Sequence, residues 1–224
     1  MTSKVAVFAS GRGSNFAVLA DHEPAESSWE VALLISDRDD APVLERARER
    51  SVRVQVIPIA GRPGEAVARE ILQVLEEFGI HLVLLAGFLR LIPAAVVEAY
   101  RGRMLNLHPA LLPSFGGKGM YGRRVHEAVL EAGVRITGAT VHLVDERYDR
   151  GRILAQWPVP VLGDDTAESL AARVNRVEHR LFPAVVDRVV RALAEGGELP
   201  TIPGPDTPSR AAFFLSSEAP EFFP

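Results

Sequence analysis

The chain has 224 residues, of which 47% are hydrophobic and 24% charged, and its formal net charge at pH 7 is −4. This balance is ordinary for a soluble globular protein with one sizeable core, and the negative charge gives no electrostatic basis for binding nucleic acid or a membrane. The absence of cysteine excludes disulfides, thiolate metal sites and a cysteine nucleophile. No apolar run approaches the roughly 20 residues of a membrane span and the N-terminus lacks a signal-peptide core, so we expect a cytoplasmic protein.

Short β-rich runs alternate with segments of helical spacing along the first half of the chain. The expected strands are residues 5–8, 30–35, 52–57, 81–86 and 104–107, and the expected helices are residues 15–21, 43–50, 65–78 and 93–100. This alternation predicts an α/β fold, Rossmann-like, with a mainly parallel twisted sheet and helices on both faces. The run at 81–86 is apolar nearly throughout, as expected for a strand that is buried on both sides.

The second half of the chain has a different pattern. Four glycines in residues 115–122 indicate a flexible loop, after which a helix at 125–131 and two strands at 136–144 and 153–161 are expected. The short connection between these strands predicts an antiparallel extension of the sheet. A long helix at 167–194 follows the capping residues 164–166, with a kink or break at Pro183.

We expect one domain over residues 1–195 and a Pro-rich tail over residues 196–224. Four phenylalanines in this tail suggest that it packs on something, either its own domain or another subunit.

The turn between the first strand and the first helix has the composition of a phosphate site. Gly13, Ser14 and Asn15 combine a close backbone approach, helix N–H groups and side-chain donors. Phe16 stands where a dinucleotide fingerprint has its third glycine, and the lysine of a P-loop is missing, so NAD or ATP binding is not supported. The alternative is a tight turn with a helix cap.

Asn106 and His108 lie two residues apart at the end of an apolar run. On an extended segment they point to the same face, and Pro109 biases His108 towards that conformation. An amide beside an imidazole suits a reaction in which negative charge develops on a carbonyl oxygen. The alternative is a strand end with a half-buried polar pair.

A third polar element follows the glycine-rich loop. Thr140 and His142 are expected on one face of a strand, although a lone strand histidine is more often structural. Asp149 stands just before Gly151, where a turn could aim it inward, although most charged loops are only solvated. A carboxylate that reaches His108 is expected to raise the pKa of the imidazole.

Five motifs occur in one order: 13–15, 85–90, 106–113, 140–144 and 149–151. Together they closely resemble the glycinamide ribonucleotide formyltransferases, over about residues 5–193. The resemblance implies folate-dependent transfer of a formyl group from 10-formyltetrahydrofolate to the amine of glycinamide ribonucleotide, in purine biosynthesis. Asn106 and protonated His108 would stabilise the oxyanion of a tetrahedral intermediate, and Asp149 would hold His108 protonated and help carry a proton. No metal is implied.

The resemblance also implies two sets of binding residues. The ribonucleotide set is Gly13, Ser14, Asn15, Asn175 and Glu178, and the folate set is Leu89, Arg90, Leu91, Ile92, Asn106 and Val144. The N-terminal half would then bind phosphate, and the C-terminal half would bind folate and carry the chemistry. Relatives often have Lys or Gln in place of Asn175, and Gly64 replaces an Arg used towards the folate tail, with Arg62 as the nearest substitute. The alternative for residues 89–92 is ordinary core.

Two other functions stay open at this point. One is a formyltetrahydrofolate deformylase, which would share the three catalytic residues, and the other is a folate- or nucleotide-binding module without catalysis. A methionyl-tRNA formyltransferase would have a basic C-terminal RNA-binding domain, whereas only a short tail is expected here. The expected partners are small molecules, and the sequence leaves the oligomeric state open, a homodimer included.

Overall fold

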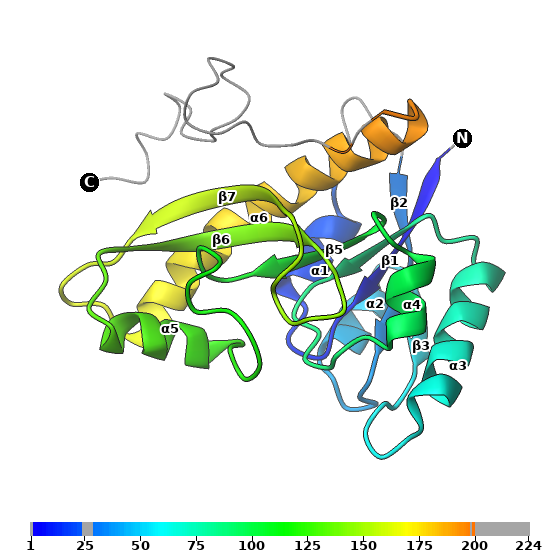
Figure 1. The fold of residues 1–224 in the computed structure, drawn as a ribbon, viewed down its shortest axis with the longest axis horizontal. Helices are drawn as coiled ribbons and strands as arrows, with labels where there is room; N and C mark the ends of the chain where they lie inside the picture. Colours follow the sequence, from blue (N-terminus) through cyan, green and yellow to red (C-terminus); the bar gives the residue numbers. More distant parts are fainter. Residues whose placement is uncertain (1, 24–28, 198, 200–224) are drawn as a thin grey trace.

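The structure is a computed structural model that describes residues 2–23, 29–197 and 199. Strands and helices alternate through most of it (Figure 1). In chain order they are β1 (Ser3–Phe8), α1 (Ser14–Ala20), β2 (Trp29–Ser36), α2 (Val43–Glu49), β3 (Arg53–Val56), α3 (Gly64–Glu77), β4 (Leu82–Leu85), α4 (Ala94–Ala99), β5 (Met104–His108), α5 (Arg123–Glu131), β6 (Ile136–Leu143), β7 (Ile153–Pro160) and α6 (Ala167–Ala194). Every element expected from the sequence is present, with ends that differ by at most two residues.

The strands form one seven-stranded sheet in the order β3-β2-β1-β4-β5-β6-β7. The pairs from β3 to β5 are parallel, whereas β5 with β6 and β6 with β7 are antiparallel. All four residues of β4 are buried, because helices cover the sheet on both faces. The predicted α/β, Rossmann-like fold with an antiparallel extension is therefore confirmed.

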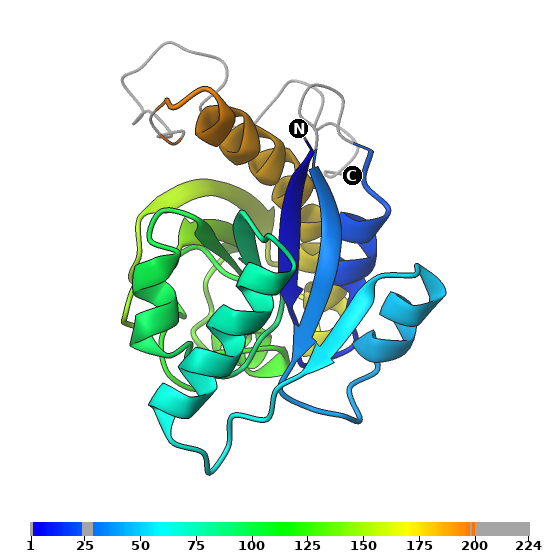
Figure 2. The same cartoon turned by 90° about the vertical axis from the view of Figure 1, so that its right-hand side faces the viewer.

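The handedness of the connections decides which face each helix covers. Right-handed crossovers place α1 and α2 on one face, and they place α3 and α4 on the other because the chain then runs in the opposite direction along the sheet (Figure 2). Alternate residues of β1 confirm this: Val7 packs in the cluster that contains Phe16 of α1, and Phe8 packs with Ile71 of α3. Helix α6 joins α1 and α2 on the first face.

The direction of the connections reverses between β1 and β4. In an open α/β sheet, ligands bind beyond the carboxyl ends of the strands at such a switch point. The segments that follow these strands are joined there, because the Ser10 amide donates to the Gly87 carbonyl at 3.2 Å. The functional site is therefore expected at this edge, which also receives the carboxyl end of β5.

Helix α6 begins with the predicted cap and runs without interruption to Ala194. Thr166 and Ser169 form a reciprocal capping box at its start. Pro183 lies inside the helix and does not end it, so of the kink or break predicted there, the break is wrong. Phe182 and Val185, on either side of the proline, are buried against the sheet, and this packing offsets the hydrogen bond that proline cannot donate.

Within residues 2–23, 29–197 and 199, no helix is both long and apolar enough to cross a membrane. The Pro-rich tail predicted at 196–224 lies outside the described residues, apart from 196, 197 and 199.

A partly buried ion pair holds the start of α6, and we expect it to be important for stability. Arg173 donates to both carboxylate oxygens of Asp165 at 2.6 and 2.7 Å, and the Asp165 side chain is only 2% exposed. The substitution Arg173→Ala leaves this carboxylate without its counter-ion, so the free energy of unfolding should fall by about 3 kcal/mol. Urea titration measures the change. The exposed pair of Arg38 and Asp40 provides the control, since Arg38→Ala should have no measurable effect.

Candidate active site

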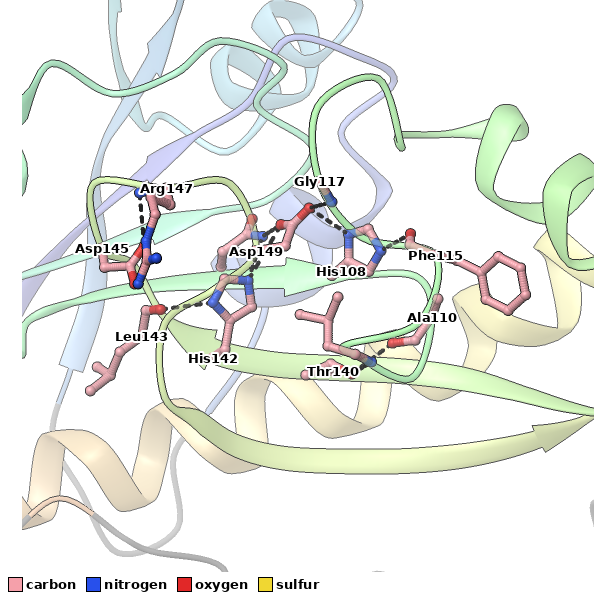
Figure 3. A network of polar contacts seen from close by, with 12 residues as sticks. His108, Ala110, Phe115, Gly117, Thr140, His142, Leu143, Asp145, Arg147 and Asp149 are labelled. Atoms are coloured by element: carbon pink, nitrogen blue, oxygen red, sulfur yellow. Dashed lines mark hydrogen bonds and ion pairs between the residues drawn. The ribbon is translucent and has the colours of Figure 1, made fainter.

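Four polar side chains from β5 and β6 share one face of the sheet. In the antiparallel register, Asn106 lies opposite His142 and His108 lies opposite Thr140. Figure 3 shows His108, Thr140 and His142 in this arrangement. Because strand side chains alternate between faces, each residue two positions away returns to the same side. Asn106 and His108 therefore point to one face, as predicted from their spacing, and the register adds two residues from β6.

Asp149 reaches this face from the loop between β6 and β7. Its backbone is in the left-handed region, with φ of +53°. Gly151 makes the return possible, because a Cβ at that position would overlap the Leu143 carbonyl oxygen. The Asp149 carboxylate lies between the two histidines of the face in Figure 3, and the Gly117 amide donates to its Oδ2 at 2.8 Å. The turn before Gly151 thus aims Asp149 inward, as expected.

His108 contacts the protein through both ring nitrogens. Its Nε2 donates to the Phe115 carbonyl oxygen at 2.8 Å, since a carbonyl can only accept, and its Nδ1 is 3.7 Å from Asp149 Oδ2. Burial lowers the pKa of His108, and the Asp149 carboxylate only partly opposes this effect. The expected effect of the carboxylate, which raises the pKa of His108, is present, but the net pKa is lowered. The physical reason is that desolvation of the ring exceeds the attraction of the carboxylate.

The carboxyl group of Asp149 shows the opposite balance. Burial alone would raise its pKa, but the contacts with His142, His108 and the Gly117 amide outweigh burial and lower the pKa below its usual value. The site at neutral pH therefore combines an ionised carboxylate with a neutral His108 imidazole.

Asn106 and His142 form the second half of this network. Asn106 Nδ2 donates to His142 Nε2 at 3.0 Å and to Asp149 Oδ1 at 3.3 Å. His142 donates from Nδ1 to the Leu143 carbonyl at 2.7 Å, so its Nε2 is the accepting nitrogen. The sequence-based reading favoured a structural role for His142, whereas the structure places it in contact with Asn106 and near Asp149. The signal that identifies it is its position opposite Asn106 in a β5–β6 pair.

The residues expected to bind the ribonucleotide lie together where α1 meets α6. Glu178 Oε2 accepts hydrogen bonds from Asn15 and Asn175, each at 2.9 Å, and Asn175 also donates to Ser14 Oγ at 3.3 Å. Gly13 has a φ of +74°, and a Cβ on it would overlap the side chain of Val43. The tight turn is therefore a steric requirement at Gly13, whatever the loop binds.

The folate set divides into exposed and buried residues. Leu89 and Leu91 are 41% and 47% exposed, so the alternative that they are ordinary core is wrong for both, whereas Ile92 belongs to the core. Arg90 donates to Asp37 Oδ2 at 3.0 Å. Val144 continues from the end of β6, and its amide donates to the Met104 carbonyl at 2.9 Å. Two large apolar side chains thus stay accessible beyond β4.

Arg62, the expected substitute for the Arg used towards the folate tail, is held by contacts within the protein. Arg62 donates to the Pro58 carbonyl at 2.9 Å and to Glu70 at 2.6 Å, so its guanidinium is held by its own loop and by α3. Gly64 begins α3 nearby, and open space surrounds the place of its missing side chain. Within the described residues, no group of three or more His, Asp or Glu side chains could hold a metal ion.

A third histidine, His126 on α5, gives a pH-dependent prediction. It is 4% exposed, its Nδ1 has no hydrogen-bond partner, and burial, with a smaller effect from His108, lowers its pKa to about 4. Between about pH 6.5 and 4 the unfolded chain then binds one more proton than the folded chain, so stability is lost as the pH falls through this range, by on the order of 3 kcal/mol. In urea titrations, His126→Gln should reduce this slope, because the lowered pKa of His108 also contributes to it, and the exposed control His81→Gln should keep the wild-type slope. An unchanged slope in His126→Gln would contradict the assignment.

The fold and this site define an α/β protein with an amide, imidazoles and a carboxylate grouped at the carboxyl end of β5. The formyl transferase family matches residues 3–186, and the chain belongs to this family. The resemblance found in the sequence motifs is therefore confirmed.

Individual relatives agree with this assignment. The chain is 48% identical over 191 residues to the chloroplastic phosphoribosylglycinamide formyltransferase of Arabidopsis thaliana. This alignment covers 83% of the chain and 65% of the relative. It is 36% identical over 190 residues to the phosphoribosylglycinamide formyltransferase of Bacillus subtilis, covering 84% and 94%. The crystal structure of the phosphoribosylglycinamide formyltransferase from Bacillus halodurans matches with a TM-score of 0.77 and 38% identity. The match covers 88% of the chain and 98% of that structure. The chain thus spans less than two thirds of the Arabidopsis relative and nearly all of the bacterial ones.

Proposed function

We propose that the chain transfers the formyl group of 10-formyltetrahydrofolate to the amine of glycinamide ribonucleotide, in purine biosynthesis. The observation that carries the proposal is the grouping of Asn106, His108 and Asp149 at the carboxyl end of β5, in a member of the formyl transferase family. The names of the Arabidopsis and bacterial relatives support the same acceptor. The chemistry needs no metal in this scheme.

In the proposed reaction the acceptor amine attacks the formyl carbon and forms a new C–N bond. The formyl oxygen takes up negative charge, which Asn106 and His108 stabilise by donating hydrogen bonds. The bond between the formyl carbon and folate N10 then breaks, N10 gains one proton and the new amide nitrogen loses one. Asp149 and His108 carry this proton, directly or through water. The formylated glycinamide ribonucleotide and tetrahydrofolate leave as products.

The lowered pKa of His108 fits this scheme because catalysis depends on the difference between the ground state and the transition state. Burial lowers the pKa of His108 and so favours the neutral ring at pH 7 before negative charge develops on the formyl oxygen. Negative charge on the formyl oxygen adds to that of Asp149, and together they favour a protonated ring when the intermediate forms. The attraction between protonated His108 and these two negative charges is thus strongest when the tetrahedral intermediate forms.

The two binding sets complete the proposal. Gly13, Ser14, Asn15, Asn175 and Glu178 in the N-terminal half and on α6 would hold the ribonucleotide. Leu89, Arg90, Leu91, Ile92, Asn106 and Val144 would line the folate site, with the exposed Leu89 and Leu91 against the pterin ring. A single catalytic domain over 1–195 and a cytoplasmic location belong to the same proposal, although two plant relatives are named chloroplastic.

The deciding experiment follows the donor spectroscopically with and without glycinamide ribonucleotide. Turnover that requires the acceptor supports the transferase. Loss of the donor without acceptor identifies a deformylase, and folate binding without turnover identifies a non-catalytic module; either result overturns the proposal.

A further inference from the structure

The hydroxyl group of Thr140 is completely engaged by its neighbours. Its Oγ1 donates to the Ala110 carbonyl at 2.6 Å and accepts from the Leu112 amide and from Gln156 Nε2, both at 3.1 Å. A hydroxyl offers one donor and two acceptor positions, so none is left for a ligand. The side chain is fully buried. Thr140 therefore holds other parts of the protein and does not contact a substrate.

Gln156 on β7 completes this arrangement from the next strand. It lies opposite Thr140 in the antiparallel register, and its Nε2 also donates to the Leu112 carbonyl at 2.8 Å. Two side chains thus satisfy the carbonyl of Ala110 and both backbone groups of Leu112. Three of these four hydrogen bonds anchor the turn at residues 110–112 to β6 and β7, and the fourth joins the side chains of Gln156 and Thr140 to each other.

This turn connects His108 to the carbonyl group that His108 binds. The chain leaves β5 at His108, passes through the anchored turn and reaches Phe115, whose carbonyl oxygen accepts from His108 Nε2 at 2.8 Å (Figure 3). A carbonyl only accepts, so the contact keeps the proton of the neutral ring on Nε2 and leaves Nδ1 as the nitrogen that faces Asp149. The tautomer of His108 thus depends on where the turn holds Phe115.

We propose that Thr140 and Gln156 are positioning residues, which anchor the turn at 110–112 so that the Phe115 carbonyl fixes the Nε2–H tautomer and the orientation of His108. The effect on turnover rests on the proposed formyl transfer. The effect on the tautomer does not, so the two can fail separately.

The test compares Thr140→Val with the matched variant Thr137→Val. Thr137 is a buried threonine of the same strand, and its Oγ1 has no hydrogen-bond partner. In ¹⁵N-histidine spectra at pH 7.5, with His108 assigned from His108→Gln, Thr140→Val should show a mixture of His108 tautomers and Thr137→Val only the Nε2–H form. Misplacement of a reacting group on this scale costs up to about 10²-fold, so kcat of Thr140→Val should fall about 10- to 100-fold with both KM values within about threefold.

Two more variants keep the test decisive. Thr140→Ser retains the hydroxyl and should restore both kcat and the Nε2–H tautomer. Gln156→Leu removes two of the four hydrogen bonds from a partly exposed position, so it carries the test if Thr140→Val does not fold. The proposal is overturned if the folded variants keep the Nε2–H form of His108, or if their kcat stays within threefold of Thr137→Val. If the wild-type protein does not transfer formyl groups, the proposed function is wrong. The ¹⁵N-histidine spectra would still show whether Thr140 and Gln156 fix the tautomer of His108.

Discussion

The substitution Asp149→Asn is expected to lower kcat about 10³-fold, within the range of about 10²–10⁴ that a positioned acid or base contributes, and to leave the fold intact. The new side chain has almost the same shape, so packing against Gly116 is retained. It lacks the negative charge that favours protonated His108 when the oxyanion forms. It also has only one acceptor oxygen, which cannot serve both the Gly117 amide and the Asn106 amide, so one of these two hydrogen bonds is lost.

Donor consumption at saturating concentrations of both substrates measures the loss. Asp145→Asn is the matched control, because Asp145 lies in the same loop and its Oδ1 accepts from the Arg147 amide at 2.8 Å. We expect that variant to keep full kcat. An Asp149→Asn protein that retains more than a tenth of the wild-type kcat would exclude a central role for this carboxylate.

Much of the fold could be predicted because its physical signals are local. Alternating β-rich and helical segments specify the parallel sheet, and the right-handed crossover then determines which helices lie on which face. The position of Asn106 and His108 at the end of β5 follows from the same pattern. Pro183 shows the limit of such signals, because its local effect on a helix is offset by distant packing of Phe182 and Val185 on the sheet.

The sequence predicts which side chains of the site lie together better than it predicts their pKa values. Spacing and motif order predict Asn106, His108 and Asp149 as site residues, and their side chains do lie together, but the net pKa of His108 depends on how deeply the ring is buried, which no local pattern gives. The contribution of His142 depends on the β5–β6 register. The contrast between exposed Leu91 and buried Ile92 likewise depends on the path of the chain beyond β4.

A second large effect is expected at Asn106, and two substitutions separate its functions there. Asn106→Ala removes a hydrogen-bond donor to the developing oxyanion, so kcat should fall by about 10²–10³. Asn106→Asp has nearly the original shape but removes the donor and places a second carboxyl group where Asn106 Nδ2 now lies 3.3 Å from Asp149 Oδ1. Two carboxylates this close cannot both ionise readily, so one pKa rises and the charge that supports His108 is weakened.

The order of the kcat values of the wild type, Asn106→Ala and Asn106→Asp therefore shows whether Asn106 acts as a hydrogen-bond donor. If Asn106 acts as a donor to negative charge, kcat should decrease from the wild type to Asn106→Ala and again to Asn106→Asp, while KM for the donor changes by much less. If Asn106 only fills space between His142 and Asp149, the aspartate variant should be the more active of the two because it preserves the packing. Steady-state kinetics of both variants distinguishes these orders, and the second order would remove Asn106 from the proposed mechanism and leave His108 as the remaining donor to the oxyanion.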